Sequence, residues 1–397
     1  MTLKICHVWD YEYPWDVRVE KVSRALTDAG HEVHLTARNR GRLPEVETIE
    51  GVATVHRLAS TPWMGKKLEA AVMFPAFFNP RWARHIRRVA EDTRADVILV
   101  RDLPLTPTAI WVGKQMGLPV IHDMAENYGA MIRDLWLTRT TRFGDVLVRN
   151  PAIVDRIEQW CLPRLDHVVV VVEESADRLA ALGTPRDKIT VVSNTPPRIR
   201  AAIDRPGRDA AKPLELVYLG LMEQARGVGA AIEAFAECRR QEIPMHMTLV
   251  GDGRNLDDFK ALAATEGLTS EDVDFLGFVQ NEKALEIVAA ADIGLIPHHV
   301  NESWNTTIPN KLFDYMAAGL VVVASNAVPV ERVLRETGAG EVFRDRDTAD
   351  LTRVLAQLAS DPDLERYQKK GQEAVRAEFN WEADTARLLS TMEAMVR

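Results

Sequence analysis

The segment Thr307-Ile-Pro-Asn-Lys-Leu-Phe-Asp314 carries the residues in this chain best suited to binding an anion. Pro309 and Gly319 predict a helix of about three turns. The N-terminus of such a helix attracts a diphosphate, and Lys311 would add a full positive charge. Asp314 shares a face with Lys311 and could accept ribose hydroxyls. The alternative is an ion pair between Lys311 and Asp314 on a solvated helix. The candidate binding residues are Thr307, Asn310, Lys311, Leu312 and Asp314.

Two further loops follow predicted strands and could complete that site. Gly220–Gly227 contains Arg226, which could bind a phosphate through two parallel hydrogen bonds, or could simply be solvated. Gly251-Asp-Gly253 follows the next strand. Leu256 stands where a dinucleotide fingerprint has its third glycine, so this loop could equally be a tight turn. We take Gly220, Arg226 and Gly251 as candidate binding residues.

The first half of the chain has a polar strand exit of its own, His122-Asp-Met-Ala-Glu-Asn-Tyr128. A histidine beside carboxylates can donate a hydrogen bond or transfer a proton near neutral pH, although at a strand end it is more often structural. The candidate catalytic residues are His122, Asp123 and Glu126, with Tyr128 beside them. Asp16 is expected to cap the first helix. Asp16 and Arg18 could also contact a ligand.

Composition and charge exclude several classes of protein. A net charge of −9 over 397 residues argues against a dedicated nucleic-acid binder. The three cysteines show no metal or redox spacing and suit a reducing compartment. The N-terminus lacks the architecture of a signal peptide, and apolar runs fall short of the ~20 residues of a membrane span. We expect a cytoplasmic protein with no cofactor. Three Asp-x-Asp strings lie at a strand start or in surface turns, so we also expect no metal.

The stretch 63–88 interleaves basic side chains with aromatic ones. Such a pattern can dock on an anionic membrane, which would place the protein peripherally at the inner face. It is equally typical of a helix whose arginines are solvated and whose aromatic residues, such as Trp82, belong to the core.

Short apolar runs alternate with amphipathic stretches along the whole chain, which predicts an α/β fold with parallel sheets. The run His167–Val172 is typical of a strand buried on both faces. A proline-rich polar stretch interrupts the alternation near the middle. We therefore predict two Rossmann-like domains, 1–195 and 214–378, joined by a linker at 196–213 and followed by a closing helix at 379–397. The carboxyl ends of the strands should face the ligand.

The chain resembles family 4 of the retaining glycosyltransferases, whose GT-B fold places two Rossmann-like domains across a cleft. The resemblance runs nearly end to end, and these motifs carry it: Tyr13-Pro-Trp-Asp-Val-Arg-Val19, Leu249-Val-Gly-Asp-Gly253, Ala291-Asp-Ile-Gly-Leu-Ile-Pro297 and Pro309-Asn-Lys-Leu-Phe-Asp-Tyr-Met-Ala-Ala-Gly319. The last motif is similar to a subgroup with Pro-Asn-Lys in its donor site. The closing helix is expected to cross back to the first domain.

The resemblance implies metal-independent transfer, with retention, from a nucleotide-diphosphate sugar. UDP is favoured over GDP as the nucleotide, and the base would lie near Phe278. The acceptor would be a glycan, a lipid-linked glycan or a small-molecule hydroxyl. Thr306 stands where the family has the first of two glutamates, and Ala125 stands where relatives have a histidine. His122 either replaces that histidine or does not. The alternatives are a nucleotide-sugar epimerase of the same fold, and a donor-binding pseudoenzyme or partner subunit.

Overall fold

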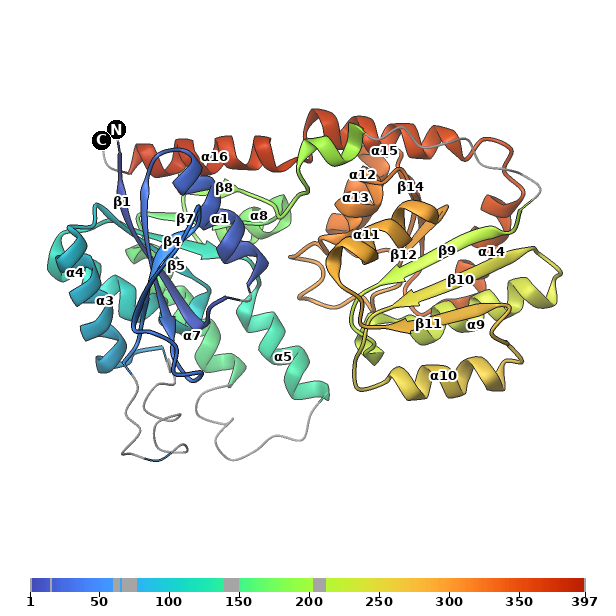
Figure 1. Cartoon of the computed structure of the whole chain (residues 1–397), viewed down its shortest axis with the longest axis horizontal. Coiled ribbons are helices and arrows are strands. Elements are labelled where there is room, and N and C mark those ends of the chain that lie inside the picture. Colours follow the sequence, from blue (N-terminus) through green and yellow to red (C-terminus); the bar gives the residue numbers. More distant parts are fainter. Residues whose placement is uncertain are drawn as a thin grey trace. The chain divides into compact units, whose positions relative to one another are not determined.

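The computed structural model describes residues 2–14, 16–59, 65, 77–138, 150–202 and 212–395, and the chain divides into two compact units. Unit 1 comprises Met1–Asn194 and Asp384–Arg397, and unit 2 comprises Thr195–Ala383. Each unit has one mostly parallel sheet with helices packed against it (Figure 1). The predicted α/β fold with two Rossmann-like units is therefore confirmed.

The sheet of unit 1 has the strand order β3-β4-β2-β1-β5-β6-β7-β8. Neighbouring strands are parallel except β3 and β4, which are antiparallel. The strands are β1 Lys4–Glu12, β2 Glu32–Arg38, β3 Val46–Ile49, β4 Ala53–Arg57, β5 Val97–Arg101, β6 Val120–Met124, β7 His167–Val170 and β8 Ile189–Val191. The helices are α1 Val17–Asp28, α3 Pro80–Thr93, α4 Thr106–Met116, α5 Tyr128–Thr138, α7 Pro151–Cys161, α8 Glu173–Ala181 and most of α16 Trp381–Ala394.

The sheet of unit 2 has the order β11-β10-β9-β12-β13-β14 and is parallel throughout. The strands are β9 Leu214–Leu219, β10 Met245–Val250, β11 Val273–Gly277, β12 Ile293–Ile296, β13 Val321–Ser325 and β14 Gly340–Phe343. The helices are α9 Val228–Arg240, α10 Leu256–Thr265, α11 Asn281–Ala290, α12 Lys311–Ala317, α13 Val328–Thr337, α14 Thr348–Ala359 and α15 Glu365–Ala377.

Both sheets reverse their strand order next to the first strand of the unit. In unit 1 the reversal lies between β1 and β5, and in unit 2 it lies between β9 and β12. Helices cover both faces of such a sheet, and for this reason central strands such as β5, β12 and β13 are buried along their whole length. The edge strands are different. The strand β3, at one edge of the unit 1 sheet, is mostly exposed to solvent. The strand β14, at one edge of the unit 2 sheet, has the sequence Gly-Glu-Val-Phe, which lacks an apolar run. The sequence pattern consequently missed these two strands.

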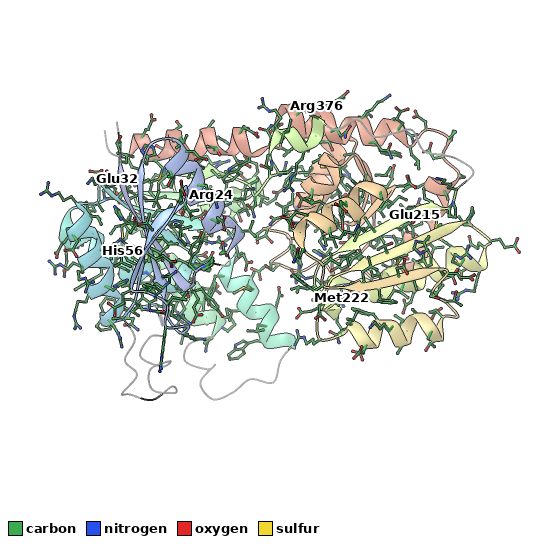
Figure 2. All side chains as sticks on the ribbon, in the orientation of Figure 1. Arg24, Glu32, His56, Glu215, Met222 and Arg376 are labelled. Atoms are coloured by element: carbon green, nitrogen blue, oxygen red, sulfur yellow. The ribbon has the colours of Figure 1, made fainter. Side chains whose placement is uncertain are left out.

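One hydrogen bond in each unit holds a peripheral helix to the rest of that unit. In α16, the buried Asp384 carboxylate accepts a hydrogen bond from the Ser193 backbone N–H at 2.9 Å, which holds this helix on unit 1. In unit 2, the short helix Arg198–Ala202 receives a hydrogen bond from Arg376 of α15 to the Ala201 carbonyl at 2.7 Å (Figure 2). This short helix lies in the predicted linker 196–213, of which 203–211 fall outside the described residues.

Tyr315 of α12 fixes that helix to the centre of the unit 2 sheet. Its hydroxyl accepts a hydrogen bond from the Leu219 backbone N–H at 2.9 Å, at the end of β9. Its ring lies so close to β12 that a Cβ on Gly294 would sit 2.3 Å from a ring carbon. Gly294 therefore allows the aromatic ring to lie against the strand and its hydroxyl to reach β9.

This packing predicts opposite effects for two glycine-to-alanine substitutions in unit 2. Gly294→Ala should destabilise the unit by about 1–3 kcal/mol, since overpacking must displace the Tyr315 ring. Gly229→Ala in α9 meets Leu262 and Phe259 only at ordinary contact distances. It should be neutral, or stabilising by up to ~1 kcal/mol. Urea unfolding of both variants measures the difference, and equal midpoints would contradict the role given to Gly294.

Candidate functional site

In sheets of this kind, ligands bind beyond the carboxyl ends of the strands where the strand order reverses. In unit 2 that position is formed by the loops after β9, β10 and β12. The first two loops interlock, since the Gly220 N–H donates to the Val250 carbonyl at 2.9 Å. A Cβ on Gly251 would lie 1.8 Å from the Gly220 carbonyl oxygen. Both glycines have positive φ angles, so close backbone approach and backbone conformation both require glycine here.

The loop after β9 is also joined to its neighbours on either side. The Met222 N–H donates to the Asp252 carbonyl at 3.0 Å, and the Met222 side chain is buried. Figure 2 labels its position in unit 2. Toward β12, the His299 N–H donates to the Ala225 carbonyl at 3.1 Å. A Cβ on Gly227 would lie 1.7 Å from the Pro297 carbonyl oxygen. The three loops therefore form one connected backbone surface.

Two positively charged side chains lie on this surface. The Lys311 ammonium lies 4.1 Å from the centre of the Tyr218 ring, and a Cβ on Gly220 would be 2.7 Å from its Nζ. The Arg226 guanidinium lies 5.0 Å from the centre of the Trp304 ring. Neither cation forms an ion pair with a carboxylate in the described part of the chain.

The two charges affect each other. Burial of the Lys311 ammonium, followed by the positive charge of Arg226, lowers the pKa of Lys311 well below its ordinary value. The arrangement is therefore electrostatically unfavourable without a ligand. A polyanion bound beside both groups would relieve the repulsion, and this makes the loop surface a suitable site for a diphosphate.

The helix that carries Lys311 is shorter than predicted. The sequence suggested about three turns from Pro309, whereas α12 covers only the seven residues Lys311–Ala317. The chain turns tightly at its start, because the Leu312 and Phe313 N–H groups donate to the Pro309 and Asn310 carbonyls. These two N–H groups are used within the turn, and the diphosphate contact at this helix N-terminus stays a prediction. The charge for an anion comes from the side chains.

The other predicted binding residues of unit 2 have different environments. Leu312 is fully buried in the core, and Thr307 is buried with its hydroxyl donating to the Ser303 carbonyl at 3.0 Å. Asp314 lies 3.4 Å from Arg200. Asn310 is exposed, and Phe278, just after β11, is 80% exposed. The structure thus brings together three of the predicted residues, Lys311, Gly220 and Gly251. The sequence analysis missed two aromatic contacts of the cations, Tyr218 beside Lys311 and Trp304 beside Arg226.

In unit 1, the corresponding edge of the sheet holds a buried ion pair. Both Arg18 and Asp123 are nearly fully buried, and Arg18 Nε and Nη2 donate to the Asp123 carboxylate at 2.6–3.0 Å. Arg18 also donates to the Val192 carbonyl at 3.0 Å. Burial alone would raise the pKa of Asp123, but the charge and hydrogen bonds of Arg18, and then the charge of Arg101, hold it below its ordinary value. Two predicted site residues are therefore partners of each other.

His122 lies inside β6 rather than at its end, so the predicted position at a strand exit is wrong. Its ring is buried, and Nδ1 lies 2.9 Å from the Thr106 hydroxyl. Burial lowers the pKa of His122 to about 4, which is far from the near-neutral value expected from the sequence. The strand continues through Asp123 because Arg18 neutralises that carboxylate. An isolated sequence cannot reveal this pairing.

The remaining predicted residues of unit 1 have different environments. Asp16 caps α1 by accepting from the Val19 N–H at 2.8 Å, as predicted, and lies 3.8 Å from Arg101. Glu126 is exposed. Tyr128 begins α5 and is partly buried against the hydrophobic core.

Asp102, directly after β5, is a residue that sequence reasoning missed. Its φ angle is 58°, a conformation that side-chain-bearing residues rarely adopt and that often marks functional sites. Burial raises the pKa of Asp102 to about 7, even though Arg101 lies 3.5 Å away and opposes the shift. The carboxyl group therefore stands at the reversal point of the unit 1 sheet and can exchange a proton near neutral pH.

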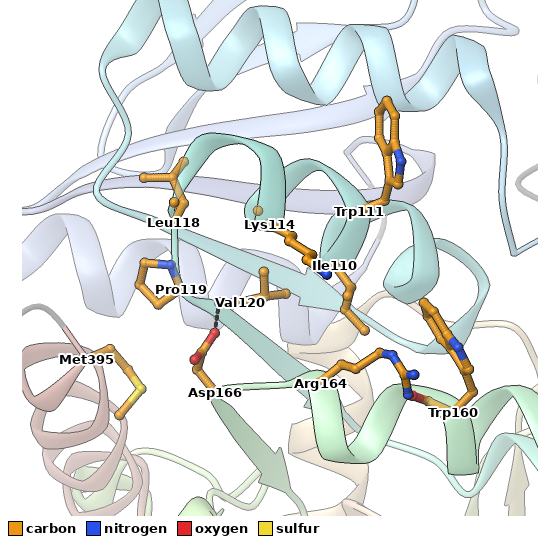
Figure 3. A pocket seen from close by; sticks show the side chains of 12 residues that line it. Ile110, Trp111, Lys114, Leu118, Pro119, Val120, Trp160, Arg164, Asp166 and Met395 are labelled. Carbon is orange, nitrogen blue, oxygen red and sulfur yellow. Dashed lines mark hydrogen bonds between the residues drawn. The ribbon is translucent and has the colours of Figure 1, made fainter.

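A cavity of about 650 Å³ lies in unit 1 but away from these residues (Figure 3). It is lined by Pro119, Val120 and Asp166, whose carboxylate accepts from the Val120 N–H at 2.8 Å. These residues stand at the amino ends of β6 and β7. The cavity therefore belongs to the edge of the sheet opposite to the one where ligands of this fold class bind.

The basic and aromatic stretch 63–88 is described only in part, because 60–64 and 66–76 lie outside the described residues. In α3, Trp82 is fully buried, whereas Arg87 and Arg88 are exposed and pair with Glu91 and Asp92 four residues on. Membrane contact through this stretch stays a prediction. Among the described helices, none combines the length and the apolarity that crossing a bilayer requires. The described His, Cys, Asp and Glu side chains also form no cluster of three that could hold a metal.

The chain is similar to known glycosyltransferases over most of its length. Residues 16–195 match the family described as "Glycosyl transferase 4-like domain", and residues 213–361 match "Glycosyl transferases group 1". A phosphatidyl-myo-inositol mannosyltransferase of Mycobacterium leprae is 29% identical over 98% of this chain and 95% of that protein. A putative colanic acid biosynthesis glycosyltransferase of Escherichia coli is 26% identical over 60% of this chain, and the match spans 59% of that protein.

Solved structures confirm the predicted GT-B fold. A sucrose-phosphate synthase from Thermosynechococcus elongatus superposes with a TM-score of 0.75 at 16% identity, covering 99% of both chains. HepE of Anabaena in complex with UDP-glucose has a TM-score of 0.70 at 14% identity and covers 99% of this chain and 100% of that one.

The buried pair of Arg18 and Asp123 predicts a strongly non-additive effect on stability. Asp123→Ala or Arg18→Met alone should cost about 3–5 kcal/mol, because each removes the hydrogen-bonded partner of a buried charge. The double variant should cost much less than the sum. Glu20→Ala, which breaks an exposed pair with Arg24, is the control and should change stability by ~0.5 kcal/mol or less. Urea unfolding gives the comparison, and additive single effects would show that the two groups do not stabilise each other.

Proposed function

We propose that this chain, which belongs to the GT-B glycosyltransferases with a glycosyltransferase 4-like and a group 1 domain, transfers a sugar with retention from a nucleotide-diphosphate sugar. The observation that carries this proposal is the pair of cations in unit 2. Lys311 and Arg226 lie at the reversal point of a Rossmann-type sheet and lack an ion-pair partner among the described carboxylates. Such a site is suited to the diphosphate of a donor.

The chemical role of the two cations follows from the charge that develops during transfer. The bond between the sugar C1 and the diphosphate oxygen breaks, and negative charge accumulates on the leaving diphosphate. Lys311 and Arg226 would stabilise that charge more strongly in the transition state than in the bound donor. The acceptor hydroxyl would attack the same face of the sugar, and its proton would pass to the leaving phosphate oxygen. Chemistry of this kind needs positioning and electrostatic stabilisation more than a protein nucleophile.

The nucleotide is proposed to be UDP in preference to GDP. HepE, which shares the fold, has been solved with UDP and with UDP-glucose, and this supports the choice. The exposed Phe278 ring follows β11, two strands from β9, and would offer an apolar surface to the base.

The acceptor is assigned to unit 1, where Arg18, Asp16, Tyr128 and the raised-pKa carboxyl of Asp102 surround the reversal point of the sheet. A glycan, a lipid-linked glycan and a small-molecule hydroxyl are all within this proposal. Relatives named for a phospholipid acceptor and for exopolysaccharide synthesis support testing both kinds.

Removing the Lys311 charge should strongly impair transfer. Once a thermal-shift screen of nucleoside diphosphates has identified the donor, Lys311→Ala should lower turnover by roughly 10²-fold or more. Lys260→Ala is a matched control, since Lys260 is exposed on α10 in the same unit. Initial rates with a panel of sugar acceptors provide the measurement. Near-normal turnover of the Lys311 variant would refute the assigned diphosphate site.

The lowered pKa of Lys311 predicts that diphosphate binding takes up a proton. Burial and Arg226 lower that pKa in the free protein, and bound phosphates should raise it again. Affinity should then fall as pH rises from the free-protein pKa to the pKa in the complex. Titration calorimetry with UDP in buffers of different ionisation enthalpy measures the uptake. Lys311→Arg stays charged and should remove this contribution. Unchanged uptake in that variant would assign the proton to another group.

A further inference from the structure

His298 follows the end of β12 and lies on the same loop surface as the two cations. Its carbonyl accepts a hydrogen bond from the Ser325 hydroxyl at 2.5 Å. The backbone on either side is fixed as well, by the contact between Pro297 and Gly227 and by the hydrogen bond from the His299 N–H to Ala225. The position of His298 is therefore set by two neighbouring segments of the sheet edge, the end of β13 and the loop after β9.

The His298 ring is buried but lacks hydrogen bonds. Its exposed fraction is 2%, and within the described part of the chain neither Nδ1 nor Nε2 has a hydrogen-bond partner. A buried polar group without a partner costs stability, and such groups are uncommon in folded proteins. The neighbouring His299 differs, since its Nδ1 lies 3.0 Å from the Asp345 carboxylate. The ring of His299 thus has a polar partner within the protein, whereas the ring of His298 has none among the described residues.

Trp304 connects the unpaired ring to the candidate diphosphate site. The centres of the His298 and Trp304 rings are 4.4 Å apart, and the Arg226 guanidinium lies 5.0 Å from the centre of the same indole ring. Burial, and then the charges of Lys311 and Arg226, lower the pKa of His298, so its imidazole is neutral. A neutral imidazole offers one N–H donor and one acceptor.

The charges beside His298 restrict the class of ligand that could bind its ring. A third cation would add to the repulsion between Lys311 and Arg226, and an apolar group would leave the ring nitrogens unsatisfied. A polyanion with several acceptor oxygens satisfies all three side chains at once.

We propose that His298 is a third protein ligand of the donor diphosphate and donates a hydrogen bond from its neutral ring to a phosphate oxygen. Trp304 would act as a positioning residue that holds His298 and Arg226 at the distances found here. This inference rests on the function proposed for unit 2. It assigns the histidine to binding rather than to proton transfer.

Inorganic pyrophosphate is the probe that separates this role from packing, because it lacks both base and sugar. His298→Phe retains an aromatic ring beside Trp304 but cannot donate a hydrogen bond. It should bind pyrophosphate and UDP roughly tenfold to a hundredfold more weakly, while the melting temperature of the free protein stays unchanged or rises. His298→Gln should recover part of the affinity through its amide N–H. His299→Gln is the matched control and should bind both ligands normally.

A second measurement on the wild-type protein does not depend on how the variants fold. The ring ¹⁵N signals of His298, identified by their loss in His298→Gln or by contact with Trp304, should shift when pyrophosphate saturates the protein. Unmoved signals, or normal pyrophosphate affinity in a folded His298→Phe, would overturn the role of His298. If Lys311→Ala also bound pyrophosphate normally, the diphosphate site itself would be wrong, so the two failures can be told apart.

Discussion

The organisation of unit 2 depends on holding two like charges close together at the edge of a parallel sheet. Lys311 and Arg226 are stabilised by aromatic faces, those of Tyr218 and Trp304, rather than by carboxylates. Contacts between a cation and an aromatic ring offset part of the desolvation cost without neutralising the charge. The Arg226 charge, and the Lys311 amine that is expected to take up a proton when an anion binds, therefore remain available to a ligand. The surrounding loops must be rigid to keep the cations in place, and the glycine-mediated backbone contacts provide that rigidity.

In unit 1, by contrast, the buried cation Arg18 is paired with a carboxylate. Arg18 is fully engaged by Asp123 and the Val192 carbonyl, so this cation contributes little net charge to a ligand. The carboxyls of Asp10 and Asp102 lie near Arg38 and Arg101, so these charges also offset one another, and burial raises the pKa values of the two carboxyls to about 6 and 7. An edge of this kind suits a neutral hydroxyl-bearing molecule better than a polyanion. The two edges thus differ in the charge of the ligand that each could accept, which accords with a donor site in unit 2 and an acceptor site in unit 1.

Much of the fold could be predicted from the sequence because both sheets are built from strongly apolar strands. The edge strands β3 and β14 were missed since half-solvated strands carry no such signal. The importance of Lys311 followed from its unusual position in a first helical turn. His298 could not be recognised, because its defining property is the absence of partners after folding. Two adjacent histidines directly after a buried strand were the one available signal. The position and pKa of His122 were predicted wrongly for the converse reason, because burial and the contact with Thr106 arise only on folding.

The glycines in the contacting loops of unit 2 also limit how the donor selectivity of this enzyme could be changed. Gly227, Gly251 and Gly253 each face backbone atoms at distances that exclude a Cβ, and Gly220 has a positive φ angle that favours glycine. In the proposed donor site these loops would line the phosphates, and donor selectivity could not be diversified through them, because substitutions there would push the loops apart. Adaptation to another nucleotide or sugar is confined to side chains beyond that surface, such as the exposed Phe278. A mutational library aimed at new donors would be best placed there, where variation leaves the backbone of the site intact.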